Sequence, residues 1–211
     1  ICRIETDDGL IFDDASVKGD EIREGQGYPG VRIKFLGLLA KARITLQFDI
    51  GFGDAVTPDP AEIEFPTLLD FPSPQLRAYP KETVVAEKFE AMVRLGMTNS
   101  RMKDFWDLNY LIQKCEFDGK ILQNAILATF DRRQTNFPLK TPLPLTPEFS
   151  NDKVKQTQWN AFLRKNDLDS TLGLDQVTET LRLFFDPFIE SHKDNPGLFW
   201  KAAKWNSDAN E

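Results

Sequence analysis

The sequence predicts an α+β protein, with strands in the first third of the chain and helices after residue 80. Two observations predict this class. Between residues 31 and 52 apolar and polar residues alternate, which is the pattern of a half-buried strand. From residue 80 onward apolar residues recur at spacings of three and four, which is the pattern of an amphipathic helix.

The strand pattern is clearest in "ARITLQFDIGFG", residues 42–53, whose apolar side chains share one face while Asp49 and Gln47 lie on the other. "GVRIKFLGLLA", residues 30–40, alternates in the same way, and "GQGYPG" before it predicts a turn. At the N-terminus, "ICRIE" and "GLIFD" are separated by "TDD", which predicts a hairpin over residues 1–13.

The helical pattern begins at Pro80, a residue suited to the first helical position. This helix is expected to end at "GMTNS", residues 96–100, where Asn99 or Ser100 caps the next helix. Further helices are expected near residues 118–132, 153–165, 173–190 and 196–204. We therefore expect a β-rich part over residues 1–79, a helical part over 80–136, a Pro-rich linker over 137–149 and C-terminal helices over 150–211.

The composition is that of a soluble globular protein with an acidic balance, a net charge of −7 and a pI near 4.9. This charge argues against non-specific nucleic-acid binding but allows a small anionic ligand or a basic partner. Cys2 and Cys115 have no metal or redox spacing, which favours reduced thiols and a cytoplasmic location. No apolar run is long enough to cross a membrane, and the single histidine, His192, argues against a histidine-based triad or zinc site.

Two expected helices each place a charge among their apolar residues. On a wheel over residues 84–96, Lys88 lies about 40° from Val84, inside the apolar arc, whereas Glu87, Glu90 and Arg94 take the opposite face. In the next helix, Asp104 falls between Leu108 and Leu111, and Arg101 also falls in the apolar arc. Lys103, Asp107 and Lys114 are expected on its other side.

Two interpretations of these charges remain open. A Lys88–Asp104 or Arg101–Asp104 ion pair would be purely structural, or Lys88 could extend past the arc to water. Alternatively, Lys88 binds a phosphate and Asp104 orients it. If the polar face of the strand over residues 42–53 looks toward the helices, Asp49 would join them as a candidate Mg²⁺ ligand.

Three segments carry a resemblance to a known family: "LQFDIGFGDAVTPDP", "YPKETVVAEKFEAM" and "NSRMKDFWDL". Together they closely resemble the AbiEii/AbiGii toxin family, over about residues 8–135. These are nucleotidyltransferase-like toxins of abortive-infection and toxin–antitoxin systems. The resemblance implies a polymerase-β-like nucleotidyltransferase sheet, with its N-terminal part expected to be missing, followed by a helical region.

The resemblance also implies an activity. A toxin of this type would transfer a nucleoside monophosphate from an NTP to a hydroxyl, with Mg²⁺ as cofactor, RNA as a candidate acceptor and a cognate antitoxin as partner. Lys88 and Asp104 match the family's catalytic lysine and later catalytic aspartate, and Asp49 resembles the third strand carboxylate. Lys88 and Arg101 would bind the nucleotide, Asp104 would position it or Lys88, and Asp49 would bind metal or accept a proton.

The chain departs from the family pattern in one respect. The family opens with a Gly-Gly-Thr or Gly-Ser turn and an Asp-x-Asp pair that carries the metals, and neither "TDDGL" nor "FDD" matches it. Because the sequence starts at Ile1, we expect it to begin downstream of that motif. The sequence leaves open whether the chain is an enzyme. The alternatives are a truncated or non-catalytic relative that binds nucleotide, RNA or protein, and an unrelated α+β domain.

Overall fold

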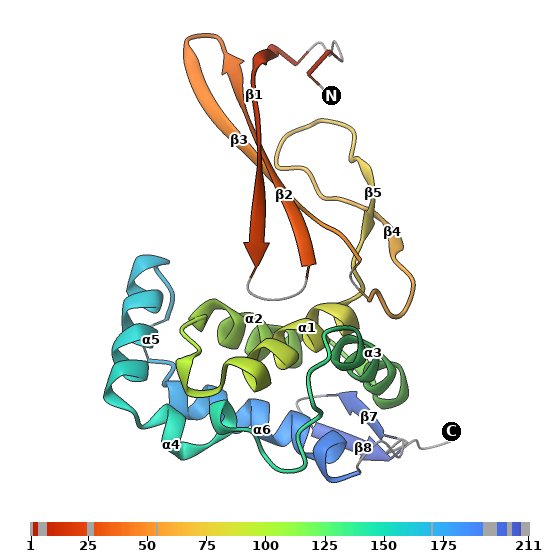
Figure 1. The fold of residues 1–211 in the computed structure, drawn as a ribbon, viewed down its shortest axis with the longest axis vertical. Helices are drawn as coiled ribbons and strands as arrows, with labels where there is room; N and C mark the ends of the chain where they lie inside the picture. The colour runs from red at the N-terminus through yellow and green to blue at the C-terminus, as the bar shows by residue number, and fades with distance from the viewer. Residues whose placement is uncertain are drawn as a thin grey trace. The chain divides into compact units, whose positions relative to one another are not determined.

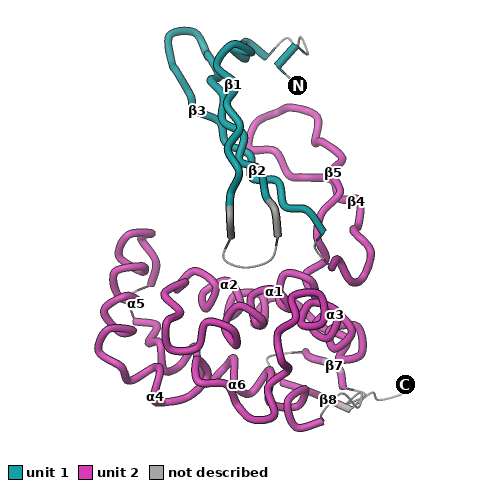
Figure 2. The backbone as a smooth tube through the Cα atoms, in the orientation of Figure 1, with its two compact units in different colours: residues 1–54 teal, residues 55–211 magenta. Residues whose placement is uncertain are grey.

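The computed structural model describes residues 2–3, 8–24, 28–53, 55–169, 171–191, 198–201 and 204–207. The chain divides into two compact units, residues 1–54 and 55–211, which Figure 2 colours separately. Five strands precede the main helices, so the α+β class is confirmed (Figure 1). The expected boundary at residues 79/80 differs from the observed one because strands β4 and β5 belong to the second unit.

Unit 1 is an antiparallel sheet in the order β1-β2-β3, with β1 over Leu10–Glu24, β2 over Tyr28–Leu39 and β3 over Ala42–Gly51. The expected alternation is confirmed, since Phe35 faces Leu46 and Ile33 faces Phe48 in the register of β2 and β3. Phe35 is buried and stacks on Phe48 with 5.7 Å between ring centroids. Much of the apolar face of β3 is nevertheless exposed.

The first strand, β1, begins within the segment expected to form an N-terminal hairpin. Residues 1 and 4–7 of that hairpin lie outside the described residues, so the hairpin stays a prediction, and β1 pairs with β2. β1 also continues through residues 14–24, a polar stretch with little strand signal of its own. After an irregularity between Asp13 and Lys18, pairing with β2 determines the structure of residues 18–24, because neighbouring strands satisfy each other's N–H and C=O groups.

Unit 2 begins with a two-stranded arm, β4 over Ala61–Glu64 and β5 over Gln75–Ala78. Its helices are α1 over Lys81–Leu95, α2 over Met102–Lys114, α3 over Gly119–Arg132, the short α4 over Pro147–Ser150, α5 over Lys153–Lys165 and α6 over Leu174–Glu190. All five long helices expected from the sequence before residue 196 are confirmed. None of the helices in the described part of the chain is both long and apolar enough to cross a membrane.

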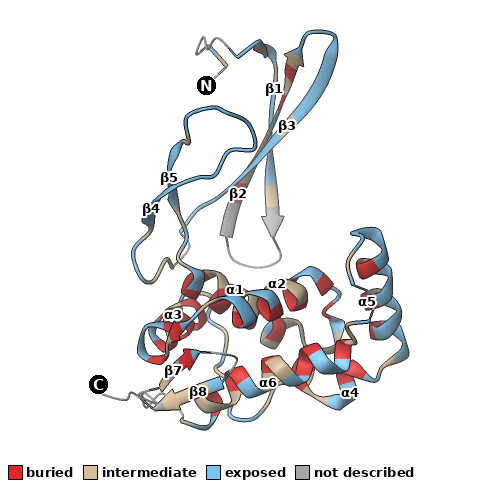
Figure 3. Cartoon of the chain, turned by 180° about the vertical axis from the view of Figure 1, so that it is seen from behind, coloured by how far each residue is buried: buried red, intermediate tan, exposed pale blue. Residues whose placement is uncertain are grey.

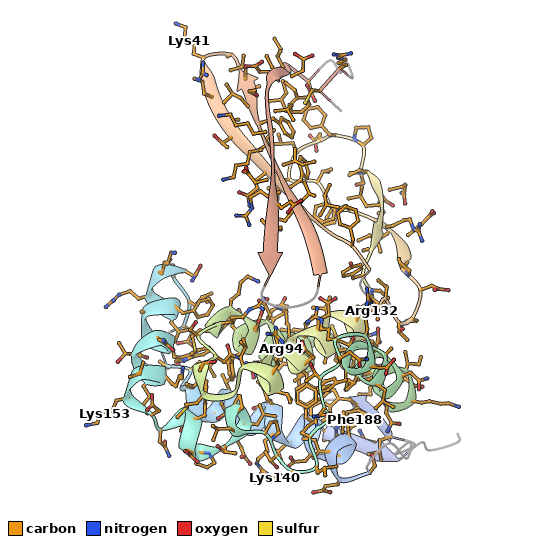
Figure 4. All side chains as sticks on the ribbon, viewed as in Figure 1. Lys41, Arg94, Arg132, Lys140, Lys153 and Phe188 are labelled. Atoms are coloured by element: carbon orange, nitrogen blue, oxygen red, sulfur yellow. The ribbon has the colours of Figure 1, made fainter. Side chains whose placement is uncertain are left out.

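The hydrophobic core lies between these helices, where buried positions on α1, α2, α3 and α6 meet (Figure 3). Phe89 of α1 stacks on Phe185 of α6, with ring centroids 4.0 Å apart and planes 7° apart. Phe188 belongs to this core, whereas Lys153 at the start of α5 points outward (Figure 4). Aromatic packing therefore holds α1 against α6.

Glu90 of α1 was expected on the exposed face, and this expectation is wrong. Its side chain is fully buried and accepts hydrogen bonds from Arg94 at 3.0 Å, Thr135 at 2.6 Å and Arg133 at 2.8 Å. A buried carboxylate is stable when its oxygens are bonded to cations and donors in this way. This network ties α1 to the end of α3.

The helix expected over residues 196–204 is also wrong. Residues Leu198–Lys201 and Lys204–Ser207 form strands β7 and β8, which join the short β6, Phe117–Asp118, in a three-stranded sheet. Trp200 lies directly opposite Trp205 and is buried in the core. Cross-strand pairing of two large aromatic residues stabilises a strand pair over a helix here.

The Pro-rich segment expected as a linker contains ordered structure. Leu143–Leu145 forms a 3₁₀ helix (η2), followed by α4, and both Leu145 and Phe149 are buried. Phe149 stacks on Phe105 of α2 with 5.3 Å between centroids. The segment thus contributes to the core of unit 2.

Candidate functional site

Helices α1 and α2 follow each other closely and lie side by side (Figure 1), which brings their charged residues together. α1 ends at Gly96, whose φ of +51° is favourable for glycine and strained for other residues. The 3₁₀ turn Gly96–Thr98 (η1) then leads to α2. The capping residue of α2 is Arg101 rather than Asn99 or Ser100, and Asn99 instead accepts the Arg101 N–H at 2.9 Å.

The two helices place Lys88 between two carboxylates. Its ammonium nitrogen lies 2.6 Å from Asp104 Oδ1 and 2.9 Å from Asp107 Oδ2. The Asp104 side chain is 7% exposed and the Lys88 side chain 18% exposed. The sequence-based pairing of Lys88 with Asp104 therefore occurs in the structure, at a site that remains accessible to a small ligand.

The contacts in this site favour the charged forms of Lys88 and Asp107. Burial alone would lower the pKa of Lys88, but its hydrogen bonds to Asp104 and Asp107 and their negative charges outweigh burial and raise it. Burial would likewise raise the pKa of Asp107, but hydrogen bonds from Lys103 and Lys88 lower it below its ordinary value. Lys88 is thus a cation and Asp107 an anion at neutral pH.

Asp104 has one buried oxygen without a hydrogen bond. Its Oδ2 lies 2.9 Å from Arg101 Nε, which is close enough for an ion pair, but the geometry is not that of a hydrogen bond. A buried acceptor without a donor costs free energy and usually indicates a water molecule or ligand partner. Both ion pairs considered as structural alternatives are present, so pairing alone does not decide between a structural and a ligand-binding role.

The cluster carries more positive than negative charge. Lys103 contacts the same Asp107 oxygen as Lys88, at 2.6 Å, and Arg101 is exposed over more than half of its side chain. The formal net charge of the cluster is +1, because it contains three basic residues, Lys88, Lys103 and Arg101, and two acidic residues, Asp104 and Asp107. In a chain with a net charge of −7, this local excess favours an anionic ligand.

A pocket of about 310 Å³ opens beside Lys88. It is lined by Val84 and Lys88 from α1 and by Trp106, Asp107, Tyr110 and Leu111 from α2. Mostly apolar walls with a few convergent polar groups are typical of small-molecule sites, and the volume is at their lower end.

Asp49 lies in unit 1, while Lys88 and Asp104 lie in unit 2, so their expected convergence stays a prediction. Within its own sheet, Asp49 accepts two hydrogen bonds from Arg32, at 2.8 and 2.7 Å. These bonds, the Arg32 charge and Gln47 lower the pKa of Asp49. A lowered pKa makes Asp49 a weaker proton acceptor than an unpaired aspartate.

The expected Mg²⁺ has no ready site in the described residues. Among them, no three His, Cys, Asp or Glu side chains gather in a way that could bind a metal ion. Both oxygens of Asp49 are engaged by Arg32, and the accessible carboxylate Asp107 is engaged by two lysines. These donors do not fit a resident Mg²⁺, which prefers several free oxygen ligands.

Sequence reasoning missed three residues of this site: Asp107, Trp106 and Tyr110. Asp107 was expected on the opposite side of its helix from Asp104, and this expectation is wrong because both contact Lys88. The signal was present, since residues three apart are neighbours on a helix. The i, i+4 pair Trp106 and Tyr110 on the same side of α2 could have been found in the same way.

Comparison with known proteins agrees with the resemblance seen in the sequence. Residues 1–185 match the family model described as nucleotidyl transferase AbiEii toxin, type IV toxin–antitoxin system. Searches of curated proteins and of solved structures gave no significant match. The match covers most of the chain, including every residue of the α1–α2 site. The chain therefore belongs to the AbiEii family of nucleotidyl transferase toxins of type IV toxin–antitoxin systems.

Proposed function

We propose that this protein transfers a nucleoside monophosphate from an NTP to a hydroxyl group, with RNA as acceptor. The observation that supports this most strongly is the Lys88 ammonium, fixed by Asp104 and Asp107 within a cluster of net positive charge. A positioned ammonium that is charged at neutral pH is suited to binding a triphosphate. Family membership supplies the reaction class.

In the proposed reaction, the acceptor oxygen forms a bond to the α-phosphorus, the bond from that phosphorus to the bridging oxygen breaks, and pyrophosphate leaves. Lys88 binds the triphosphate, and Arg101, whose side chain is largely exposed, provides a second cation. Asp104 positions Lys88 through the 2.6 Å contact. Asp49 is the proposed acceptor of the hydroxyl proton, on the resemblance to the family's strand carboxylate.

Mg²⁺ enters the proposal as the ion that accompanies the NTP, since triphosphates bind this ion through their own oxygens. The polymerase-β-like fold of the family is part of the same proposal. The toxin–antitoxin family implies an antitoxin as partner.

Transfer is tested with NTPs labelled at the α-phosphate, Mg²⁺ and cellular RNA. We expect label in RNA and release of pyrophosphate by the natural protein, loss of both in Lys88→Met and retention in Lys120→Met. Lys120 is a suitable control because it is an exposed lysine of the same unit. Equal incorporation by Lys88→Met and the natural protein would refute the assignment of Lys88.

A second candidate function, binding of a protein partner, is favoured by the arm of unit 2. This arm and its connecting loop expose large apolar side chains, with Leu68 fully exposed, and the set is Ile63, Phe65, Leu68, Leu69, Phe71 and Leu76. Exposed apolar groups gathered in this way are typical of interaction surfaces. Co-purification with the antitoxin of the same system, lost in Leu68→Ser/Leu69→Ser, would support this function, and unchanged co-purification would refute it.

A further inference from the structure

The pocket beside Lys88 has two chemically different ends. Lys88 and Asp107 provide charge at one end. One helical turn away along α1 and α2, respectively, Val84 and Leu111 provide an apolar end. A ligand that matches both ends is anionic in one part and apolar in another.

The aromatic residues of the pocket narrow the class of ligand. Trp106 and Tyr110 are four residues apart and line the pocket from the same side of α2. Trp106 also packs on Trp159 and Phe162 of α5, with 6.4 Å between ring centroids in each case, which fixes its position. Tyr110 makes no ring contact within the described residues and is 55% exposed, so its ring is free to contact a ligand. Flat aromatic walls are suited to a planar ring.

The polar groups of the pocket can each make a further hydrogen bond to a ligand. The Lys88 ammonium has three hydrogens, and in the described part of the chain it contacts two acceptors, Asp104 Oδ1 and Asp107 Oδ2. Lys88 and Lys103 both contact Oδ2 of Asp107, so Oδ1 remains an acceptor. The pocket thus offers one cationic donor and one anionic acceptor next to aromatic rings.

We propose that the pocket between α1 and α2 binds the nucleoside part of the substrate, with the base stacked on Tyr110 and Trp106. This inference rests on the proposed function, because Lys88 binds the phosphates of the same molecule. Asp107 Oδ1 accepts a hydrogen bond from an N–H of the base or a hydroxyl of the ribose. The volume of about 310 Å³ accommodates a nucleoside and leaves the triphosphate to reach past Lys88.

The test measures binding of the nucleoside part and of the phosphate part of the ligand separately. Calorimetric titrations use the four nucleosides, the four NTPs with Mg²⁺, and inorganic triphosphate. The variants are Tyr110→Ala, Tyr110→Phe, Lys88→Met and Phe52→Ala. Tyr110 is preferred to Trp106 because its exposed ring can be removed without disturbing the α5 contacts. Phe52 is the matched control, an exposed aromatic residue of unit 1 that belongs to neither proposed binding surface.

We expect Tyr110→Ala to weaken NTP and nucleoside binding about 5- to 150-fold, which corresponds to about 1–3 kcal/mol of base–aromatic stacking. Inorganic triphosphate binding stays unchanged in this variant, and Tyr110→Phe and Phe52→Ala behave like the natural protein. Lys88→Met weakens triphosphate binding and leaves nucleoside binding in place.

The two proposals fail in different ways. NTP binding that depends on Lys88 but not on Tyr110 overturns the nucleoside pocket and leaves the proposed function standing. Nucleoside binding that depends on Tyr110, without any triphosphate binding, supports the pocket and contradicts the phosphate role of Lys88. Absence of binding by both nucleosides and NTPs overturns the pocket.

Discussion

Replacement of Lys88 by Met leaves Asp104 buried without its main partner. Asp104 Oδ1 loses a contact of 2.6 Å, and its side chain is only 7% exposed, so water cannot replace the ammonium freely. Removing one member of a buried ion pair costs about 3–5 kcal/mol. Arg101 beside Oδ2 offsets part of this loss, and Asp107 keeps Lys103. We therefore expect Lys88→Met to lower the free energy of unfolding by about 3 kcal/mol.

The assay is urea unfolding followed by circular dichroism. With a slope of roughly 2 kcal/mol per molar urea, the midpoint should fall by about 1.5 M, and Lys120→Met should not change it. The double variant Lys88→Met/Asp104→Leu removes both charges and should recover most of the loss, because an apolar pair can replace a buried ion pair. A midpoint shift of less than about 0.3 M in Lys88→Met would refute the reasoning, since Asp104 would then be solvated in the folded protein.

Three further outcomes are expected. Asp107 has a lowered pKa, so its ionised form stabilises the folded protein above the ordinary pKa of 3.8, and this stabilisation is lost as the pH falls through the lower folded-state pKa. The difference in free energy of unfolding between the natural protein and Asp107→Asn should therefore be constant near neutral pH and should shrink in acid. Phe185→Ala removes a ring stacked 4.0 Å from Phe89 and should cost about 3–5 kcal/mol in urea unfolding, whereas a loss below about 1 kcal/mol would contradict the described core. Asp49→Asn should change the unfolding midpoint little, because the Arg32 pair is partly exposed to solvent and such pairs contribute little stability. It should reduce transfer about 10²–10⁴-fold if Asp49 accepts the proton, and full activity would remove Asp49 from the reaction.

The helices of unit 2 could be predicted well because each buries one face. The expected helix over residues 153–165 coincides with α5, and the expected helix over 118–132 coincides with α3 within one residue. The apolar arc around Lys88 also predicted the pairing with Asp104, since a buried charge needs a partner. These predictions succeeded because helical periodicity is a local property of the sequence.

The failures share a different cause. Residues 198–207 contain aromatic residues that fit a helix or a strand equally well, and pairing with Phe117–Asp118, about eighty residues earlier in the chain, decides for strands. Residues 18–24 form a strand by pairing with β2. Asp107 lies about 40° from Leu111 on the helical wheel, at the edge of the apolar arc. It belongs to the site because Lys88 of the neighbouring helix contacts it. Partners distant in the chain are not visible in local patterns.

The contact of Trp200 with α2 has a consequence for the newly made protein. The Trp200 indole N–H donates to the carbonyl oxygen of Ile112 at 2.8 Å, so a residue beyond the family match at 1–185 completes the end of the helix that carries Asp104 and Asp107. Domains generally fold as synthesis proceeds from the N-terminus. We expect α2 to reach its final packing only after residue 200 has left the ribosome. A chain interrupted earlier would lack this hydrogen bond to α2, so the helix that carries Asp104 and Asp107 would be incompletely supported.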